Sequence, residues 1–227
     1  MVVESGDRDR LTSVRVYVPK HFEESRTEVL HELVRDHPFA VLVTQSTAGL
    51  EANHIPMEIE ATPAPLGTLL GHVARSNPVW RESSPDVEAL AIFQGPHGYV
   101  SPGWYPSKGE SGKVVPTWNY AVVHAYGRIR FVEDVAWLRS IVERLTRRHE
   151  APRAEPWDVT DAPSDFVAAM LGGIVGVEMR LTRLVGKWKL SQNRSPEDRR
   201  GVVAGLAEPS PSSRPDLLDL MRRSSES

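Results

Sequence analysis

The sequence predicts a mainly β fold with peripheral helices, of the α+β class, built around a small antiparallel barrel. About six segments with strong β character precede the last third of the chain, and turns of hairpin length join most of them. Most of the helical periodicity comes late in the sequence. A doubly wound parallel sheet would need a helix after almost every strand, so the pattern favours the antiparallel barrel.

The predicted strands are separated by clear turn signals. Residues 14–22 are expected to form a short extended entry, and Gly95-Pro96 should bend the fourth strand. A long loop rich in Gly, Ser and Lys, residues 102–113, separates that strand from the next one. Strands are predicted over residues 39–45, 50–60, 68–76, 88–101, 112–133 and 174–185.

The helices are predicted from apolar residues at helical spacing and from their caps. In the first helix, Val29, Leu30, Leu33 and Val34 lie at helical spacing, and His37-Pro38 ends it. Ser195, followed by two acids in the first turn, marks the start of a later helix. Helices are predicted over residues 24–37, 133–150, 162–173, 195–206 and 216–223.

The stretch "GKVVPTWNYAVVHAYG", residues 112–127, is an unusual strand. Its alternation places Trp118, Tyr120, His124 and other large side chains on one face, and mostly small apolar ones on the other. It carries no charge between Lys113 and Arg128. A strand with one solvated face should carry charges there, so both faces are predicted to be covered.

Length and composition exclude several classes of protein. The chain of 227 residues suits a barrel domain over 15–206, with a disordered extension at 1–14 and a linker and short helix at 207–227. With no cysteine, it has no disulfides, thiolate metal sites or cysteine nucleophile. No run of about 18 apolar residues and no signal peptide pattern occurs, so a cytoplasmic protein that does not span a membrane is expected.

The charge balance weakens the case for a direct DNA binder. The formal net charge is −3, and the basic residues are interleaved with acids. Phosphate neutralisation supplies much of the affinity of DNA-binding proteins, which usually carry a basic surplus or stripe. A helix-turn-helix would need two helices joined by a tight turn, and the helices within 134–172 have a Pro-rich connection of the wrong length. Direct DNA binding is therefore doubtful.

Three groups of polar and aromatic residues lie near predicted strand ends. His72, Arg75, Ser76 and Asn77 could form a phosphate cradle, although spacing alone favours an exposed arginine beside an Asx-type turn. The stretch "GPHGYVSPGWYPSK" could be the wall of a pocket for a planar ligand or a surface loop anchored by its rings. Donors in "GKWKLSQNR" could bind an anion or a polar ring, or form a basic turn; they are Lys187, Lys189, Ser191, Gln192, Asn193 and Arg194.

The histidines leave a haem site open. His54, His72 and His124 lie on predicted strands and could project into one cavity. Neither HxH nor HExxH spacing is present, which disfavours zinc. A single imidazole can bind haem iron without any spacing motif, whereas for any one histidine a core residue bonded to backbone or carboxylate is favoured. No GxSxG, GxGxxG or P-loop pattern is found, so triad hydrolases, dinucleotide folds and P-loops have no support.

The order of these motifs resembles the PaiB-type family of FMN-binding negative transcriptional regulators. The resemblance runs from Tyr17 to about Leu206 and rests on combined motifs that no chance match would reproduce. The motifs are "YVPKHF", "HPFAVLVT", "GLEANHIP", "GHVARSNPVWR", "ALAIFQGPHGYVSPGWYPSK", "VVPTWNYAVVHAYG" and "IVGVEMRLTRLVGKWKLSQNRSPEDRRGVVAGL".

This resemblance implies an antiparallel split β-barrel of the FMN-binding type, which usually forms a homodimer with cofactor sites at the subunit interface. Such an interface would account for a strand covered on both faces. By motif position the resemblance implies cofactor-binding roles for His72, Arg75, Ser76, Asn77, Thr117, Trp118, Asn119, Lys189, Ser191 and Gln192. No catalytic residue is assigned.

Three functions follow from the resemblance and the residues. The leading one is an FMN-binding flavoprotein that acts as a regulatory protein responsive to redox state or a metabolite. The alternative is an enzyme using haem b on the same barrel, similar to piperazate synthases that close an N–N bond in N-hydroxyornithine, with His54, His72 or His124 as the iron ligand. Direct DNA repression, the family's label, ranks last because of the charge balance.

Overall fold

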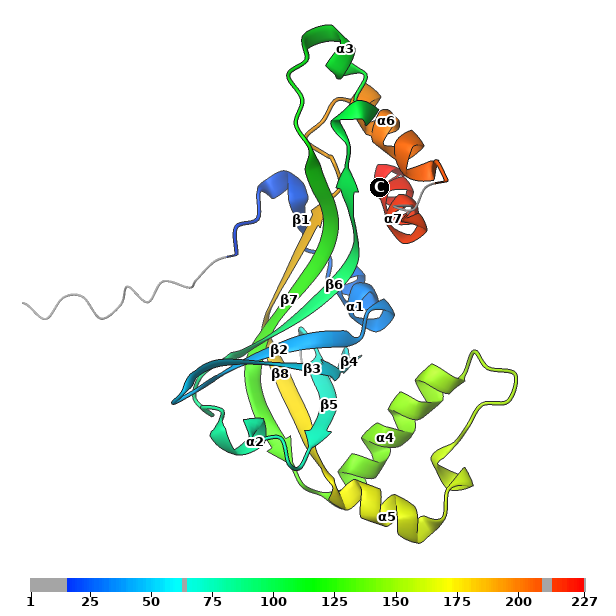
Figure 1. Cartoon of the computed structure of the whole chain (residues 1–227). Helices are drawn as coiled ribbons and strands as arrows, with labels where there is room; N and C mark the ends of the chain where they lie inside the picture. The colour runs from blue at the N-terminus through cyan, green and yellow to red at the C-terminus, as the bar shows by residue number, and fades with distance from the viewer. Residues whose placement is uncertain (1–15, 63–64, 210–213, 227) are drawn as a thin grey trace, which may run out of the picture.

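Three long antiparallel strands form the spine of the protein in this computed structural model, which describes residues 16–62, 65–209 and 214–226. They are β6 (Ala89–Val100), β7 (Thr117–Val132) and β8 (Ile174–Lys189). Figure 1 shows them running along the long axis of the molecule. The extension predicted to be disordered, residues 1–14, lies outside the described part of the chain.

The sheet has the strand order β3-β2-β6-β7-β8-β5-β4 and is antiparallel throughout. A short strand at the N-terminal side, β1, also pairs with β8. The antiparallel pairing predicted from the strand pattern is therefore confirmed. The remaining strands are β1 (Glu23–Glu24), β2 (Phe39–Ser46), β3 (Gly49–Pro56), β4 (Glu58–Glu60) and β5 (Thr68–Ala74).

The prediction of one strand over 50–60 was wrong, because the chain breaks pairing at Met57. The Met57 amide donates to the Pro38 carbonyl oxygen at 2.8 Å, which places this residue between two ladders. β3 pairs with β2, whereas β4 pairs with β5 at the other end of the strand order. Gly71 of β5 lies so close to β3 that a Cβ there would sit 2.9 Å from the Pro56 carbonyl oxygen. This contact brings the two ends of the strand order together.

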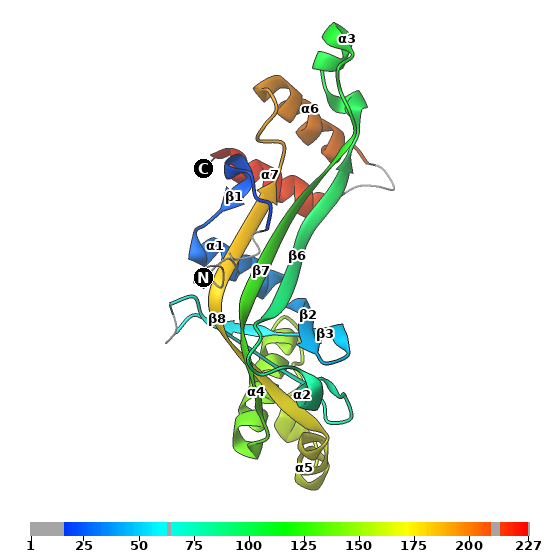
Figure 2. The ribbon, with the colours of Figure 1, turned by 90° about the vertical axis from the view of Figure 1, so that its left-hand side faces the viewer.

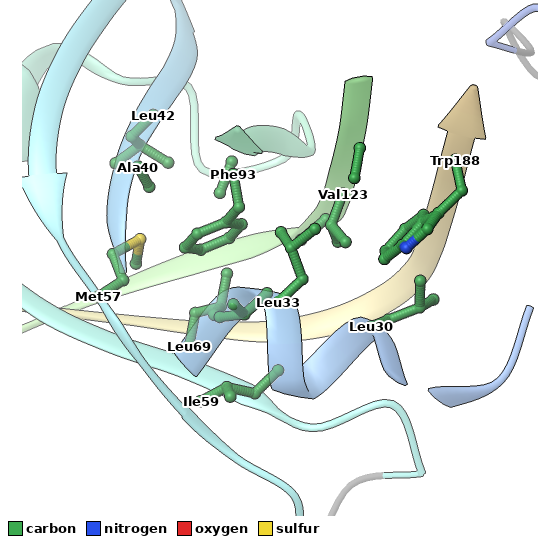
Figure 3. Packing of buried hydrophobic residues seen from close by; sticks show 14 of the residues in the cluster. Leu30, Leu33, Ala40, Leu42, Met57, Ile59, Leu69, Phe93, Val123 and Trp188 are labelled. Carbon is green, nitrogen blue, oxygen red and sulfur yellow. The ribbon is translucent and has the colours of Figure 1, made fainter. Parts of the chain in front are cut away.

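The barrel interior is filled by apolar side chains from the sheet and from helix α1 (Thr27–Asp36). Figure 3 shows Leu33 of α1 pointing among Phe93, Leu69 and Val123, while Leu30 of the same helix lies beside Trp188. The predicted helical face is confirmed, since Leu30, Leu33 and Val34 are all buried. Burying such side chains stabilises the fold by roughly 1.5–3 kcal/mol each.

The two faces of β7 differ as the alternation predicted. Asn119, Ala121, Val123 and Ala125 are buried in the interior. On the opposite face, Trp118 is exposed, and every second residue after it is half-buried, namely Tyr120, Val122, His124 and Tyr126. The sequence predicted that both faces of β7 are covered, whereas its outer face is only partly covered.

Helices cover the two ends of the long strands. Both views place α6 (Pro196–Ala207) and α7 (Pro215–Glu226) beside one end, and α4 (Val135–Glu150) and α5 (Ser164–Gly172) beside the other (Figures 1 and 2). These confirm the four late helices predicted from periodicity. Ser195 caps α6 as predicted, because its hydroxyl accepts from the Asp198 amide at 3.1 Å.

The predicted loop at 102–113 contains helical turns that the sequence reasoning missed. They are the 3-10 turn η2 (Pro102–Trp104) and the short helix α3 (Ser107–Ser111). The expected extended entry at 14–22 likewise includes a 3-10 turn, η1 (Lys20–Phe22). The remaining short elements are α2 (Val79–Glu82) and η3 (Val159–Asp161). Among the described residues, no helix is both long and apolar enough to cross a membrane.

Candidate functional site

The predicted site residues lie in two groups at opposite ends of β8. Ala74, at the end of β5, pairs with Ile174, the first residue of β8. Tyr120 of β7 pairs with Lys189, the last residue of the same strand. Fifteen residues of strand separate the two positions, which corresponds to about 50 Å along the chain. One mononucleotide cannot contact both groups within a single subunit.

At the first end, three of the five N–H donors of Arg75 bond within the fold. Its Nε donates to the Gly172 carbonyl oxygen at 2.8 Å, and one Nη donates to that of Ile174 at 3.1 Å. The other Nη forms an ion pair with Glu133 at 2.5 Å. The guanidinium thus ties β5 to the junction between α5 and β8, where α5 leaves its last carbonyls without helical partners.

The neighbours of Arg75 also make structural contacts. The Asn77 side-chain oxygen accepts from the Val79 amide at 3.0 Å, and its Nδ2 donates to Asn53 at 2.7 Å. This is the Asx-type turn that was considered from spacing, and it begins α2. Ser76 is exposed beside it. The four residues of this group do not converge on one point.

His72 points away from the rest of its group, toward α4. It lines a cavity of about 290 Å³ together with Leu145, His149 and Trp157. Its Nδ1 is buried without an acceptor or donor among the described residues. Burial lowers the pKa of the His72 imidazole below its usual value.

At the other end of β8, the structure brings the remaining predicted residues together. Asn119 of β7 is buried, and its Nδ2 donates to the Ser191 hydroxyl at 2.9 Å and contacts the Met221 sulfur at 3.5 Å. Ser191 has a φ of 66°, a left-handed conformation that costs free energy for a residue other than glycine. The turn after β8 is therefore held against β7 and α7 by a buried polar contact.

Gln192 closes the same turn. Its Oε1 accepts from the Leu190 amide at 2.6 Å, and its Nε2 donates to the Trp188 carbonyl oxygen at 2.6 Å. Both the oxygen and the nitrogen of the side-chain amide are thus bonded to the backbone. Gln192 positions the end of β8 and its neighbour Ser191.

Lys189 presents its ammonium at the open side of this cluster. The Nζ donates to the Thr117 hydroxyl at 2.6 Å and to the Trp118 carbonyl oxygen at 2.5 Å. An ammonium has three donors, so one remains for another acceptor. Burial, assisted by the nearby cations Lys187 and Arg194, lowers the pKa of Lys189 below its usual value.

A groove of about 600 Å³ opens beside Lys189, and we call it the lysine groove. Its basic groups are Lys187 and Lys189, and aromatic rings form much of its walls. The Lys187 Nζ lies 5.3 Å from the Tyr17 ring and 5.5 Å from the Tyr120 ring. The lining residues are Tyr17, Pro19, His21, Phe22, Thr117, Trp118, Tyr120, Lys187, Lys189 and Asn193.

Several residues that line the lysine groove were not in the predicted cofactor-binding set, although Lys187 was named among the donors of its segment. Lys187 belongs there because it lies two residues before Lys189 and so projects from the same face of β8. That period was readable from the sequence. Tyr17 and Phe22 come from the N-terminal segment, whose pairing with β8 through β1 had no local sequence signal.

Two of the three histidines considered as iron ligands share the outer face of the sheet. His54 and His124 lie in one cross-strand row, in which His54 pairs with Val41, Val41 with Ile92 and Ile92 with His124. The His124 Nδ1 is buried without a partner among the described residues. Burial, together with Arg183 and Lys187, lowers the pKa of His124. His72 lies elsewhere, against α4, so no single cavity collects all three.

Comparison with known sequences assigns the barrel to a family. The family model described as "Putative FMN-binding domain" matches residues 16–183. Protease synthase and sporulation protein PAI 2 of Bacillus subtilis is 31% identical over 211 residues, which cover 91% of this chain and 96% of that protein. An uncharacterized protein of Emericella nidulans is 33% identical over 226 residues, which cover 84% and 90% of the two chains.

Solved structures confirm the predicted fold class. Flavocytochrome Anf3 from Azotobacter vinelandii superposes with a TM-score of 0.55 at 11% identity, covering 78% of this chain and 74% of that one. The FAD and heme binding protein from Mycobacterium smegmatis gives 0.53 at 15% identity, covering 74% and 73%. At identities this low, the superpositions show the shared fold alone, which is a split barrel. The family model supports FMN as the cofactor. The chain therefore belongs to the PaiB-type family of FMN-binding split-barrel proteins.

Proposed function

We propose that the protein is a homodimer that binds FMN in the lysine groove and regulates other processes in response to redox state or a metabolite. One observation carries the proposal. In a chain of an FMN-binding family, two ammonium groups and several aromatic rings converge on one groove at the end of β7 and β8. A planar ring system bearing a phosphate matches both kinds of lining.

The lysines suit the phosphate. Lys189 keeps one ammonium donor beyond its bonds to Thr117 and Trp118, and Lys187 uses one donor on the Tyr17 carbonyl oxygen at 3.0 Å. Charge-assisted hydrogen bonds to a phosphate are roughly twice as strong as neutral ones. A dianion here would also offset the mutual repulsion that contributes to the lowered pKa of Lys189.

The aromatic residues suit the ring system. Trp118 is 53% exposed, an unusual degree for the largest apolar side chain. Its ring lies 6.1 Å from that of His97 and 6.4 Å from that of Tyr99. An isoalloxazine ring or a partner subunit would remove this surface from water.

The outer face of β7 supports the dimer. Tyr120, Val122, His124 and Tyr126 are half-buried, with few charges among them, and Arg183 lies 3.6 Å above the Tyr126 ring. In a dimer with a two-fold axis perpendicular to this face, the β8 strands of the two subunits would point in opposite directions. The Arg75 end of each subunit would then approach the partner's lysine groove. Both predicted residue groups could thereby contribute to one site.

Bound FMN would supply reversible one- and two-electron redox chemistry. The chain's own residues bind and orient the cofactor: Lys187 and Lys189 hold the phosphate, and Trp118 covers the ring. Asn119 and Ser191 fix the turn that follows Lys189 at the end of β8. A net charge of −3 supports regulation through redox state or a metabolite rather than through direct contact with DNA.

The absorption spectrum and the molar mass of the purified protein test this proposal. We expect flavin bands near those of free FMN and a dimer by light scattering. Val122→Asp, on the outer face, should give a monomer that loses FMN because it places a charge in the interface. Val135→Asp, at an exposed position on α4, is the matched control. A colourless protein that takes up no added FMN, or a Val122→Asp monomer with unchanged FMN affinity, would contradict it.

Haem b is the second candidate cofactor. Iron ligation needs a neutral imidazole, and burial lowers the pKa of both His72 and His124. Each also has a buried Nδ1 without a partner among the described residues. A Soret band that disappears in His124→Ala or His72→Ala alone would identify the ligand. Flavin bands without a Soret band would exclude this candidate, and with it the N–N bond-forming reaction.

A further inference from the structure

A second polar groove lies between α6 and α7, outside the family match at 16–183. It has a volume of about 750 Å³, which is the size of a small-molecule site. Four arginines converge on it, and no acidic residue is among the described residues that line it. We call it the arginine groove. Its lining is Gln192, Arg194, Pro196, Arg199, Arg200, Val203, Ala204, Ala207 and Arg222.

The arginines of this groove retain binding capacity. Arg200 pairs with Glu197 at 2.8 Å and Arg222 with Asp219 at 3.8 Å, but all four side chains of these pairs are more than half exposed. Exposed pairs of this kind contribute little stability and exchange readily for a better anion. The groove therefore presents two guanidinium groups held only by weak surface pairs.

The other two arginines are held by neutral groups. Arg194 lies 4.7 Å above the Tyr105 ring. Arg199 donates through one Nη to the Ser224 carbonyl and hydroxyl oxygens at 3.2 and 3.0 Å, and its Nε is buried without an acceptor among the described residues.

The floor of the arginine groove is apolar. Val203, Ala204 and Ala207 of α6 line it with small side chains, which leaves room for an apolar group beneath the cations. A planar guanidinium matches two oxygens of a phosphate at once, and a dianion can engage two such forks.

We propose that the arginine groove binds a small organic phosphate monoester, with the phosphate among the arginines and its apolar body on α6. Ligand contacts to both Arg200 of α6 and Arg222 of α7 would tie the two helices together. Met221 of α7 contacts Asn119, which bonds to Ser191 in the turn after β8. A ligand that holds α7 in place would therefore also stabilise that turn. The site would exist whether or not FMN binds in the lysine groove.

Calorimetry with phenyl phosphate, inorganic phosphate and phenol tests the proposal on the full chain. Phenyl phosphate should bind at least about tenfold more tightly than either fragment, because only it fills both parts of the groove. Arg200→Gln and Arg222→Gln should each weaken phenyl phosphate about tenfold, as loss of a charge-assisted bond implies. Both positions are exposed, so these variants are expected to fold.

Arg153→Gln is the matched control. Arg153 is an exposed arginine in an i,i+3 pair with Glu150 at 3.0 Å, like Arg200 with Glu197, but it lies after α4. It should leave binding unchanged. Equal weakening by Arg153→Gln, equal affinity for phenyl and inorganic phosphate, or displacement of phenyl phosphate by a single-stranded oligonucleotide at lower concentration would each overturn the proposal. The last outcome would identify the groove as a nucleic acid contact instead.

Discussion

The two ends of β8 carry similar residues but use them differently. At the β5 end, the guanidinium of Arg75 bonds to two carbonyl oxygens and a carboxylate, and the amide of Asn77 bonds to Asn53 and within its own turn. At the β7 end, Lys189 has a donor left over and faces a groove of about 600 Å³. Both ends appear in the sequence as a dense run of donors after a strand.

The difference follows from how many internal acceptors each group of donors meets. An end that must join a helix to a strand offers many unpaired carbonyl oxygens, and nearby donors pair with them. The end of β8 instead runs into a turn whose backbone is already bonded to Gln192. Donors there have fewer internal partners and remain for a ligand.

The largest expected effect comes from the structural end. Arg75→Ala should lower the free energy of unfolding by about 3 kcal/mol, because it leaves the Gly172 and Ile174 carbonyl oxygens without their donor. Urea denaturation measures this change. Arg81→Ala, an exposed arginine stacked on Trp80, is the control and should cost less than about 1 kcal/mol. An Arg75→Ala protein of normal stability that loses FMN would invert the comparison.

A smaller loss is expected at the buried polar contact of the other end. Asn119→Ala should cost about 2 kcal/mol, because it leaves the buried Ser191 hydroxyl without its partner. A double-mutant cycle with Ser191→Ala should give a coupling free energy of about 1 kcal/mol. Additive effects would show that the two side chains do not act together.

The binding end should affect affinity more than stability. Lys189→Gln should raise the dissociation constant of FMN about tenfold, a change of about 1.4 kcal/mol, with little change in unfolding. Fluorescence quenching of added FMN measures it. Lys113→Gln, at an exposed position before β7, is the control. Equal effects of the two substitutions would place the phosphate elsewhere.

The smallest effect concerns the partly buried histidines. The lowered pKa of His72 and His124 means that the unfolded chain takes up protons first as the pH falls. The free energy of unfolding should therefore fall as the pH drops below about 6.5, through the lowered pKa of each residue. The His72→Gln/His124→Gln double variant should show a flatter pH profile over that window. An unchanged profile would mean that other groups control it.

Much of the fold was readable from local patterns, and the site was readable only in part. Alternation predicted the two faces of β7, and helical spacing predicted the buried face of α1. The break at Met57 was missed because it depends on a bond to Pro38, which tertiary structure sets. The motif resemblance named Lys189 and Asn119 together with His72 and Arg75, but it could not show that the two pairs lie at opposite ends of β8, about 50 Å apart along the strand.

The central place of β8 has a kinetic consequence. β8 pairs with β7, β5 and β1. The ladder between β5 (Thr68–Ala74) and β8 therefore cannot form until residues 174–180 have been synthesised. Such non-local pairing slows folding, because loop closure precedes the contacts that reward it. During synthesis, the edges of β5 and β7 stay open to other chains. Weaker expression, which lowers the concentration of incomplete chains, should therefore raise the yield of folded protein.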